Sequence, residues 1–330
     1  SISLCEQLGT RWNNQLDPFP LIEWINVSSL KSFYDPTFQS LLNQPLFFNE
    51  IDSLGQYQLA IQPYGFHSGY ELDGNDFKLT TFGGTVNGSV TLKERWILGA
   101  GIGYWYSSFN WGDLAHDGSL NTIYVGPYLA YVFDRGYIDL EILGIYNIYN
   151  VDQVIAKGQE INNNTTKWDL YGSIEGGIDL KGPHFTGANF FIQPTVNLSY
   201  LASLSHELKL EDEENETTLT GGFSDFFRGK IAAEFRKEFH QQGKGFIIPA
   251  LSIGWVLMQP LSHNNSTLTC GEEQNQSLFP KKYPSSQQLY VGAKFTTLSK
   301  SGFLFSLSAD AYIAKLYPIY SGNVRFEWSW

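Results

Sequence analysis

Apolar and polar residues alternate with a period of two along most of this chain. Between residues 122 and 133, Ile123, Val125 and Leu129 fall on one parity, whereas Thr122 and Gly126 fall on the other. Because a β-strand points successive side chains to opposite faces, this alternation predicts strands with one apolar and one polar face. Twelve such segments occur, near residues 56–66, 77–92, 95–110, 119–133, 136–151, 167–181, 188–203, 223–240, 245–259, 287–298, 302–316 and 319–330. The sequence therefore predicts an all-β protein.

The predicted strands are long. Strands of globular proteins mostly have about five or six residues, and many of these segments are about twice that length. A tilted strand needs about 9–11 residues to cross a bilayer. Four segments contain an internal proline, at Pro63, Pro127, Pro194 and Pro249. Proline cannot donate to a strand ladder, so we expect β-bulges or strand ends at these positions.

The connections between the segments fall into two kinds. One set is short, at residues 93–95, 134–136, 182–187, 241–245 and 299–302. The other set includes long polar stretches, at 152–166, at 205–222 and around Cys270. Short turns at one end and long loops at the other are typical of outer-membrane barrels. We therefore predict a transmembrane antiparallel up-and-down β-barrel of about twelve strands.

Charged residues within the segments fall on the parity opposite to the apolar face. A charge on the lipid face of a barrel costs about 2–4 kcal/mol at the bilayer midplane, so these side chains are expected to face the lumen. A soluble barrel of twelve strands would instead enclose an apolar space too wide for side chains to fill. The lumen-facing candidates are Asp139, Glu141, Asp169, Glu175, Arg228, Lys230, Glu234, Arg236, Lys294, Asp310, Arg325 and Glu327.

Composition agrees with this class of protein. Only 16% of the residues are charged and 16% are aromatic, whereas soluble domains average about 25% charged residues. The net charge of −12 argues against nucleic-acid binding. No run of about 18 apolar residues occurs, so no transmembrane helix is expected. The chain begins at Ser1, and we interpret it as a mature or excised fragment.

Residues 1–55 show no sustained strand alternation and are predicted to be an N-terminal extension that precedes the barrel at 56–330. Residues 1–16 are expected to form a short polar helix. A second helix is expected to begin with Asp35 as its N-cap and Pro36 as its first residue. The extension is partly helical in this prediction, and it is a linker that threads the pore or a plug.

The order and spacing of several motifs resemble the translocator (β) domain of type V autotransporters over residues 56–330. They are the strand WILGAGIGYWYSSFNW at 96–111, the strand pair at 126–150, FIQPTVNLSYL at 191–201 and IIPALSIGWVL at 247–257, followed by the terminal aromatic strand NVRFEWSW. The resemblance implies a twelve-stranded outer-membrane barrel with a helix or linker in its pore. It also implies export and anchoring of an N-terminal passenger at the cell surface.

The same resemblance implies a role for the last strand as an assembly signal. Val324, Phe326, Trp328 and Trp330 fall on one parity, and the barrel-assembly machinery would read this aromatic end. In the family the signal usually ends in Phe, and here it ends in Trp330. Trp330→Phe is therefore expected to assemble normally.

No catalytic, cofactor-binding or metal-binding residues are predicted, and the chain is not expected to be an enzyme. His67 and Ser68 are adjacent and therefore point to opposite faces of a strand. The other histidines lack the spacing of a metal or catalytic site. Cys5 and Cys270 form a disulfide if the extension runs through the pore to the external loops, or they are two free thiols.

The expected partners are outer-membrane lipid, the barrel-assembly machinery and the chain's own passenger, with no nucleic acid, and the barrel is expected to be a monomer. Its expected location is a Gram-negative-type outer membrane, with the long loops extracellular and the C-terminus periplasmic. Two alternatives stay open on the sequence: a porin-like channel with an N-terminal plug, and a surface adhesin or antigen that acts through its long loops.

Overall fold

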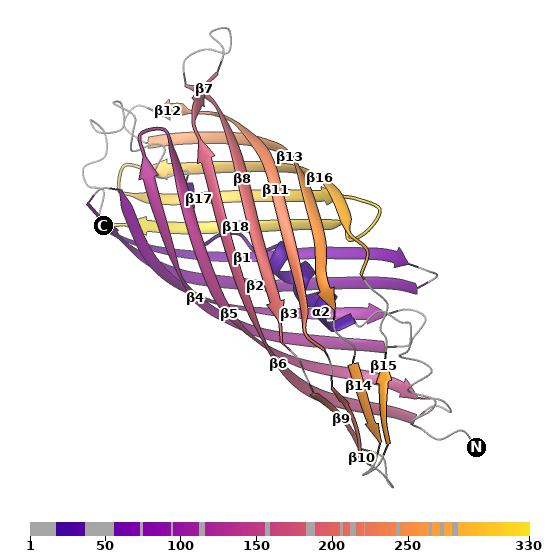
Figure 1. Cartoon of the computed structure of the whole chain (residues 1–330). Helices are drawn as coiled ribbons and strands as arrows, with labels where there is room; N and C mark the ends of the chain where they lie inside the picture. Colours follow the sequence, from indigo (N-terminus) through magenta and orange to yellow (C-terminus); the bar gives the residue numbers. More distant parts are fainter. Residues whose placement is uncertain are drawn as a thin grey trace.

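The computed structural model shows a closed antiparallel barrel of twelve strands, which confirms the predicted fold class (Figure 1). It describes residues 18–36, 56–72, 75–93, 95–111, 116–155, 159–182, 189–204, 207–211, 216–220, 222–241, 245–263, 266–270, 274–278 and 283–330. The barrel strands are β1 (Tyr57–Leu72), β2 (Asn75–Leu92), β3 (Trp96–Trp111), β4 (His116–Phe133), β5 (Gly136–Ile155), β6 (Gln159–Ile178), β8 (Phe190–Ser203), β11 (Ser224–Lys237), β13 (Gly245–His263), β16 (Ser286–Ser299), β17 (Phe303–Ile313) and β18 (Ile319–Ser329).

Two short strands extend this barrel. β7 (Leu180–Lys181) continues β6 after a break at Asp179, and β12 (Phe239–Gln241) continues β11 after a break at Glu238. The barrel closes where β1 pairs with β18, from Gln58 opposite Ser329 to Ser68 opposite Ile319. The backbones of Tyr57 and Trp330 exchange two further hydrogen bonds of 3.0 Å. Closure leaves no unpaired edge, and a barrel inside a bilayer requires this.

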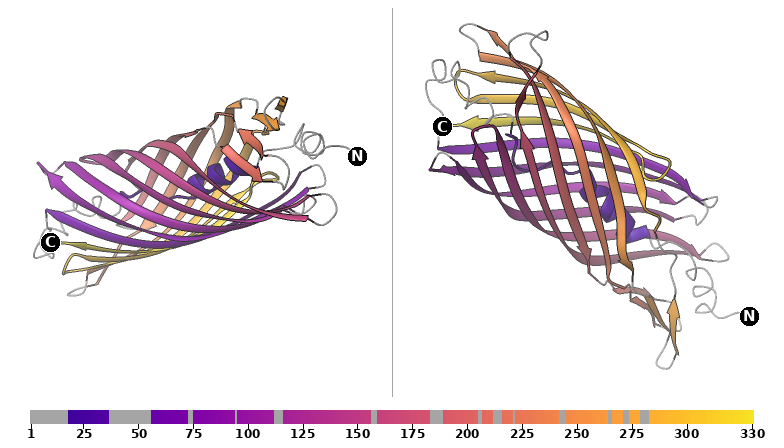
Figure 2. Two further views of the ribbon diagram at one scale, coloured as in Figure 1. Left: turned by 90° about the horizontal axis from the view of Figure 1, so that it is seen from below. Right: turned by 45° about the horizontal axis from the view of Figure 1, so that its top comes forward.

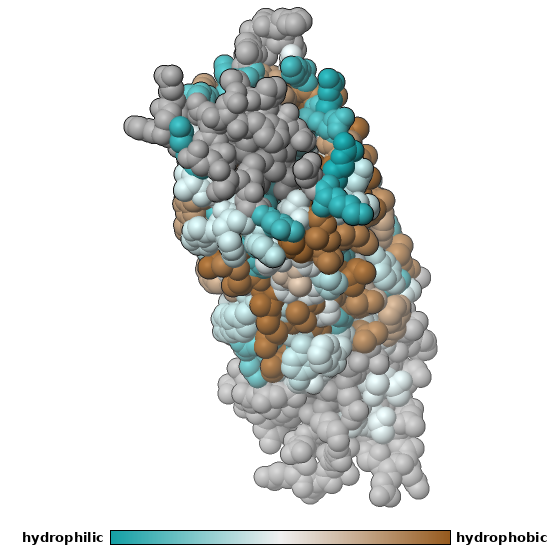
Figure 3. Space-filling model, turned by 90° about the vertical axis from the view of Figure 1, so that its left-hand side faces the viewer, coloured by the Kyte–Doolittle hydropathy of each residue, from teal (hydrophilic) through white to brown (hydrophobic). Residues whose placement is uncertain are grey.

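The outer surface of the barrel carries a band of exposed apolar side chains. Phe82, Ile231 and Leu251 are each at least 64% exposed, although they lie in the middle parts of their strands. Figure 3 shows hydrophobic side chains gathered in a band across the molecule. No helix in the described part of the chain has the length and hydrophobicity that a membrane span requires. The exposed apolar side chains of the band belong to the barrel strands.

The two ends of the barrel differ. The short connections, such as residues 93–95 and 134–135, lie at the end that also holds Tyr57 and the C-terminus, which we call the turn end. At the other end, the loop end, strands replace much of what the sequence predicted as loops. β5 and β6 continue through most of residues 152–166. The alternation signal is absent there because strands that project beyond the bilayer need no apolar face.

The two remaining predicted long loops also contain strands. β9 (Glu207–Glu211), β10 (Glu216–Thr220), β14 (Ser266–Cys270) and β15 (Gln274–Leu278) form a separate four-stranded sheet in the order β15-β14-β10-β9. Figure 1 shows these strands together beyond one end of the barrel. Each strand has five residues, which is too short for periodicity to distinguish it from a polar loop.

The prediction of β-bulges or strand ends at the four internal prolines was wrong. Pro63, Pro127, Pro194 and Pro249 all lie inside their strands and point outward, without a change of register. Each keeps its pairing with one neighbouring strand, whereas the ladder to the other neighbour is interrupted opposite the proline. A strand residue directs its N–H to only one neighbour, so the missing donor affects only that side.

A short helix, α2 (Pro18–Ser28), lies inside the barrel (Figure 2). The sequence did not predict it, because β-branched Ile22, Ile25 and Val27 disfavour a helix. Residues 21–28 of this helix are all buried, including Leu21 and Trp24, as is typical of a helix enclosed on every side. Pro36 is helical, in agreement with the predicted helix start. The predicted polar helix at 1–16 lies outside the described residues.

Candidate functional site

The candidate functional site is the barrel lumen, together with the segment 18–36 that occupies it. α2 lies nearer the loop end, where Glu23 contacts Ser203, the last residue of β8. The chain that follows α2 reaches toward the turn end, where Asp35 contacts Lys294. The segment therefore runs along the lumen rather than across its mouth.

Glu23 connects α2 to three barrel strands. Its carboxylate accepts a hydrogen bond of 2.8 Å from Lys167 Nζ on β6 and one of 2.9 Å from Ser203 Oγ on β8. The Tyr149 hydroxyl on β5 also donates to it. The Glu23 and Lys167 side chains are each only 1% exposed. Removal of one partner of such a buried ion pair leaves the other charge buried without compensation, which strongly destabilises the folded arrangement.

A second layer of contacts surrounds this ion pair. Asn147 Nδ2 lies 2.5 Å from Asp169 Oδ2 and 3.5 Å from Glu23 Oε1. Asn147 Oδ1 in turn accepts from Thr122 Oγ1 at 2.6 Å. The predicted lumen residue Asp169 therefore reaches the segment through Asn147. The network links β4, β5 and β6 to α2.

Asn26, three residues after Glu23 on the same side of α2, binds β2 and β3. Asn26 Oδ1 accepts from Thr81 Oγ1 at 3.0 Å, and Asn26 Nδ2 donates to Ser107 Oγ at 3.2 Å. Trp24 stacks on Phe226 of β11, with ring centroids 4.6 Å apart, and its edge meets Tyr317 at 5.8 Å. α2 therefore contacts the wall on several sides.

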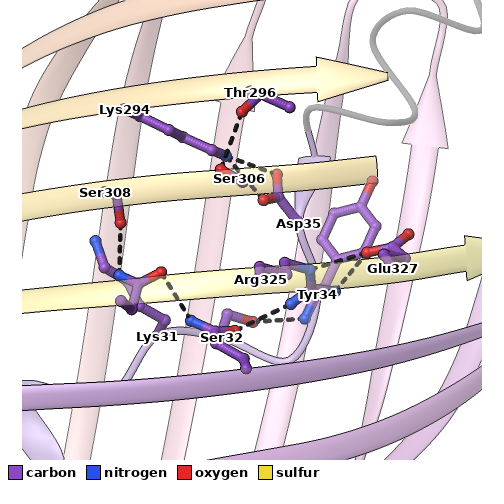
Figure 4. A network of polar contacts seen from close by, with 12 residues as sticks. Lys31, Ser32, Tyr34, Asp35, Lys294, Thr296, Ser306, Ser308, Arg325 and Glu327 are labelled. Carbon is purple, nitrogen blue, oxygen red and sulfur yellow. Dashed lines mark hydrogen bonds and ion pairs between the residues drawn. The ribbon is translucent and has the colours of Figure 1, made fainter. Parts of the chain in front are cut away.

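Side chains of residues 31–35 form three further polar contacts with the barrel, shown in part in Figure 4. Lys31 Nζ lies 2.6 Å from Asp310 Oδ2, and Lys294 Nζ lies 2.8 Å from Asp35 Oδ2. Ser32 Oγ donates to Asp139 Oδ2 at 2.8 Å. Both ion pairs join opposite charges between the segment and the wall, so they favour a single position of the segment along the barrel axis.

Phe33 packs against a glycine-rich part of β3. Its ring is 2% exposed and lies 6.3 Å from the Tyr124 ring and 5.9 Å from the Tyr128 ring. A Cβ at Gly101 would lie 2.6 Å from the Phe33 ring. Glycine at this position therefore makes room for the aromatic side chain. The backbone oxygen of Phe33 also accepts from Arg325 Nη2 at 2.9 Å.

All twelve sequence-predicted lumen residues lie on the face opposite to the apolar band. Eight are buried: Asp139, Glu141, Asp169, Arg228, Arg236, Asp310, Arg325 and Glu327. The other four are partly buried and line a cavity of about 170 Å³ beside the segment: Glu175, Lys230, Glu234 and Lys294. Four of the twelve form hydrogen bonds or ion pairs with the segment: Asp139, Lys294, Asp310 and Arg325.

Sequence reasoning missed the residues at the centre of the network. Glu23, Lys31 and Asp35 were not singled out as lumenal, because the extension has no alternation to show which side chains face the wall. Lys167 shares its parity with the predicted Asp169, and that shared parity was a signal that could have found it. Tyr149 lies in a predicted strand, but it was not selected because only charged residues were taken as lumen candidates.

The terminal strand and the cysteines can be placed only in part. Trp328 and Trp330 are exposed on the outer surface, whereas Arg325 and Glu327 point inward. Val324 and Phe326 share the outward parity of these tryptophans and are partly buried. Cys270 is the last residue of β14. Cys5 lies outside the described residues, so the hypothesis of a disulfide stays a prediction.

Comparisons with known proteins agree with this architecture. The family model described as Autotransporter beta-domain matches residues 62–310. The structure is similar to the β-domain of the Bordetella autotransporter BrkA, with a TM-score of 0.64 and 15% identity, covering 84% of this chain and 100% of that one. It is also similar to the translocator domain of NalP from Neisseria meningitidis, with a TM-score of 0.64 and 11% identity over 86% of this chain and 91% of that one.

A third similar structure is the transport unit of AIDA-I from Escherichia coli. Its TM-score is 0.57 and its identity 13%, covering 90% of this chain and 100% of that one. No curated protein sequence matches the chain significantly. At such low identities the structural matches establish the fold, and the family is established by the model match over residues 62–310.

Proposed function

The chain belongs to the autotransporter β-domain family, and from this premise we propose that residues 18–36 are the lumenal part of a connection between the barrel and a passenger N-terminal to it. The chain is an outer-membrane translocator barrel, and the porin-like alternative is not favoured. In our proposal the barrel exports and anchors the passenger, performs no catalysis and acts as a monomer. The loop end is extracellular, and the C-terminus is periplasmic.

The observation that carries this proposal is the buried ion pair between Glu23 and Lys167, which holds α2 within the lumen. A segment that only passed through the pore in transit would not need a charge-paired position. A connection that stays in the pore after export needs one, because it must hold a polar chain across the bilayer. The ion pairs of Lys31 and Asp35 support the same interpretation.

Surface display in a Gram-negative host tests the proposal. A signal peptide and an epitope tag are placed before Ser1, and antibody labelling of intact cells is compared with labelling of lysed cells. We expect the tag to be accessible on intact cells. The same tag inserted at 242–244, a turn-end connection, should be accessible only after lysis. An N-terminal tag that is labelled only in lysed cells would contradict the export direction.

The proposed partner of the last strand is the barrel-assembly machinery. Trp330 is 60% exposed on the outer surface, next to the seam where its backbone bonds to Tyr57. We expect Trp330→Phe to assemble as the unchanged chain does, because an outward aromatic ring is kept. Trp330→Ala should lower the amount of folded, heat-modifiable barrel in the outer membrane. If the alanine variant accumulates at the same level, Trp330 is not part of the assembly signal.

A further inference from the structure

Basic side chains surround the barrel at its turn end. Each of the five connections at this end carries at least one lysine or arginine within it or in the adjoining strand residue. We call this set the turn-end basic ring, and it consists of Lys93, Arg95, Arg135, Lys181, Lys237 and Lys300. All six are exposed or partly exposed. The ring therefore presents positive charge around the circumference rather than on one side.

The carboxylates near this ring offset part of its charge, and two of them, Glu94 and Asp134, lie in the same connections as Lys93, Arg95 and Arg135. Asp179 and Glu238, which interrupt the strands next to Lys181 and Lys237, both point to Arg236, with N–O distances of 2.9 and 3.4 Å. The Glu238 side chain is only 1% exposed, so its charge is directed into the protein. Asp134 pairs with Arg95 at 3.3 Å but is 90% exposed, so solvent screens that pair strongly.

The strands beyond the opposite end of the barrel are acidic. β9 and β10 together carry three glutamates and one lysine. The net charge of −12 is therefore not spread evenly along the chain. An anionic surface would attract the turn end and repel the loop end.

Aromatic side chains lie directly beside the ring on the outer surface. Trp96 packs on Tyr131, with centroids 4.6 Å apart, and Phe303 packs on Trp328 at 5.3 Å. Tryptophan and tyrosine are enriched at the level of lipid headgroups. Figure 3 shows hydrophilic side chains gathered near the top of the molecule, above the hydrophobic band. The ring thus lies at the depth where headgroups surround the barrel.

We propose that the turn-end basic ring binds the headgroups of anionic glycerophospholipids in the adjoining leaflet. A protein partner would contact one side of the barrel, whereas a lipid layer contacts every connection at once. The distribution of charge over all five connections matches the lipid layer. This interaction requires only that the barrel spans a bilayer, and it is independent of passenger export.

Lipid selectivity of the refolded full chain tests this proposal. The barrel is reconstituted in phosphatidylcholine with spin-labelled phosphatidylglycerol, and the relative association constant of the two lipids is measured. A lysine or arginine near an anionic lipid surface favours association about fivefold. The measurement averages over all lipids around the barrel, so we expect a relative association constant of about two for phosphatidylglycerol over phosphatidylcholine. The preference should disappear at 1 M salt, where the screening length is about 3 Å. No preference at low salt would overturn the proposal.

Charge-removal variants locate the effect. Lys93→Gln, Arg95→Gln, Arg135→Gln and Lys300→Gln combined remove four of the six ring charges and should lower the relative association constant most of the way to one. The matched control removes Lys78 and Lys315, two exposed cations at the loop end, and should keep the preference. Lys93→Arg combined with Lys300→Arg keeps both positive charges and should also keep the lipid preference. A combined glutamine variant that retains the full preference would overturn the proposal, and heat modifiability verifies that each variant is folded.

Discussion

Replacing Glu23 by alanine is expected to release α2 from the lumen in many molecules. The change leaves Lys167 charged, buried and without its carboxylate, and it removes the acceptor for Ser203 and Tyr149. Breaking one partner of a buried ion pair costs about 3–5 kcal/mol. This corresponds to an increase of about 100- to 4,000-fold in the ratio of displaced to seated segment. Planar-bilayer conductance should therefore show frequent large openings that the unchanged chain rarely shows.

A double substitution serves as the matched control. Glu23→Leu with Lys167→Met removes both charges and replaces them with apolar side chains of similar size. Replacing a buried ion pair in this way is often nearly neutral, so the double variant should conduct much less than the Glu23→Ala variant. If Glu23→Ala conducts like the unchanged chain, the ion pair does not hold the segment in place.

Replacing Phe33 by alanine is expected to loosen the part of the segment near the turn end. The ring is buried between Tyr124 and Tyr128 and fills the space above Gly101. Truncation of a buried phenylalanine costs about 3–5 kcal/mol. We expect more frequent conductance openings, and faster hydrogen exchange at residues 31–35. The contacts of Glu23 remain in this variant, so α2 itself should stay in the lumen.

Two comparisons make this prediction specific. Gly101→Ala places a methyl group where the Phe33 ring lies, so it should shift the segment in the same direction while Phe33 is kept. In the Phe33→Ala background the same methyl group meets no ring, and its added effect should be small. Phe82→Ala removes an equal volume from the exposed outer surface and should leave conductance unchanged. Equal effects of Phe33→Ala and Phe82→Ala would show that the buried contact is unimportant.

The sequence predicted the barrel well because a bilayer imposes a simple rule. Every membrane-spanning strand must turn apolar side chains to lipid, so on β11 the outward Ile231 alternates with Arg228 and Lys230 on the lumenal side. The rule stops at the membrane edge. The parts of β5 and β6 that project at the loop end, and the four-stranded sheet, were therefore predicted as loops.

The occupied lumen was beyond sequence reasoning. Nothing local marks α2 as a helix, since Ile22, Ile25 and Val27 favour an extended chain. It is helical because the wall encloses it and meets its polar side chains, as Asn26 shows with Thr81 and Ser107. A helix satisfies its own backbone groups, whereas an extended chain away from the sheet does not.

By itself, the sequence determined the all-β class, the number of strands in the barrel wall and the side of the wall on which its twelve predicted charges lie. Those features follow from period-two alternation, which is a property of neighbouring residues. Only the tertiary structure decided that Glu23 meets Lys167 and that Asp35 meets Lys294. These pairs join residues far apart in the chain. Their partners are set by the register of the closed barrel and by how deep the segment lies within it.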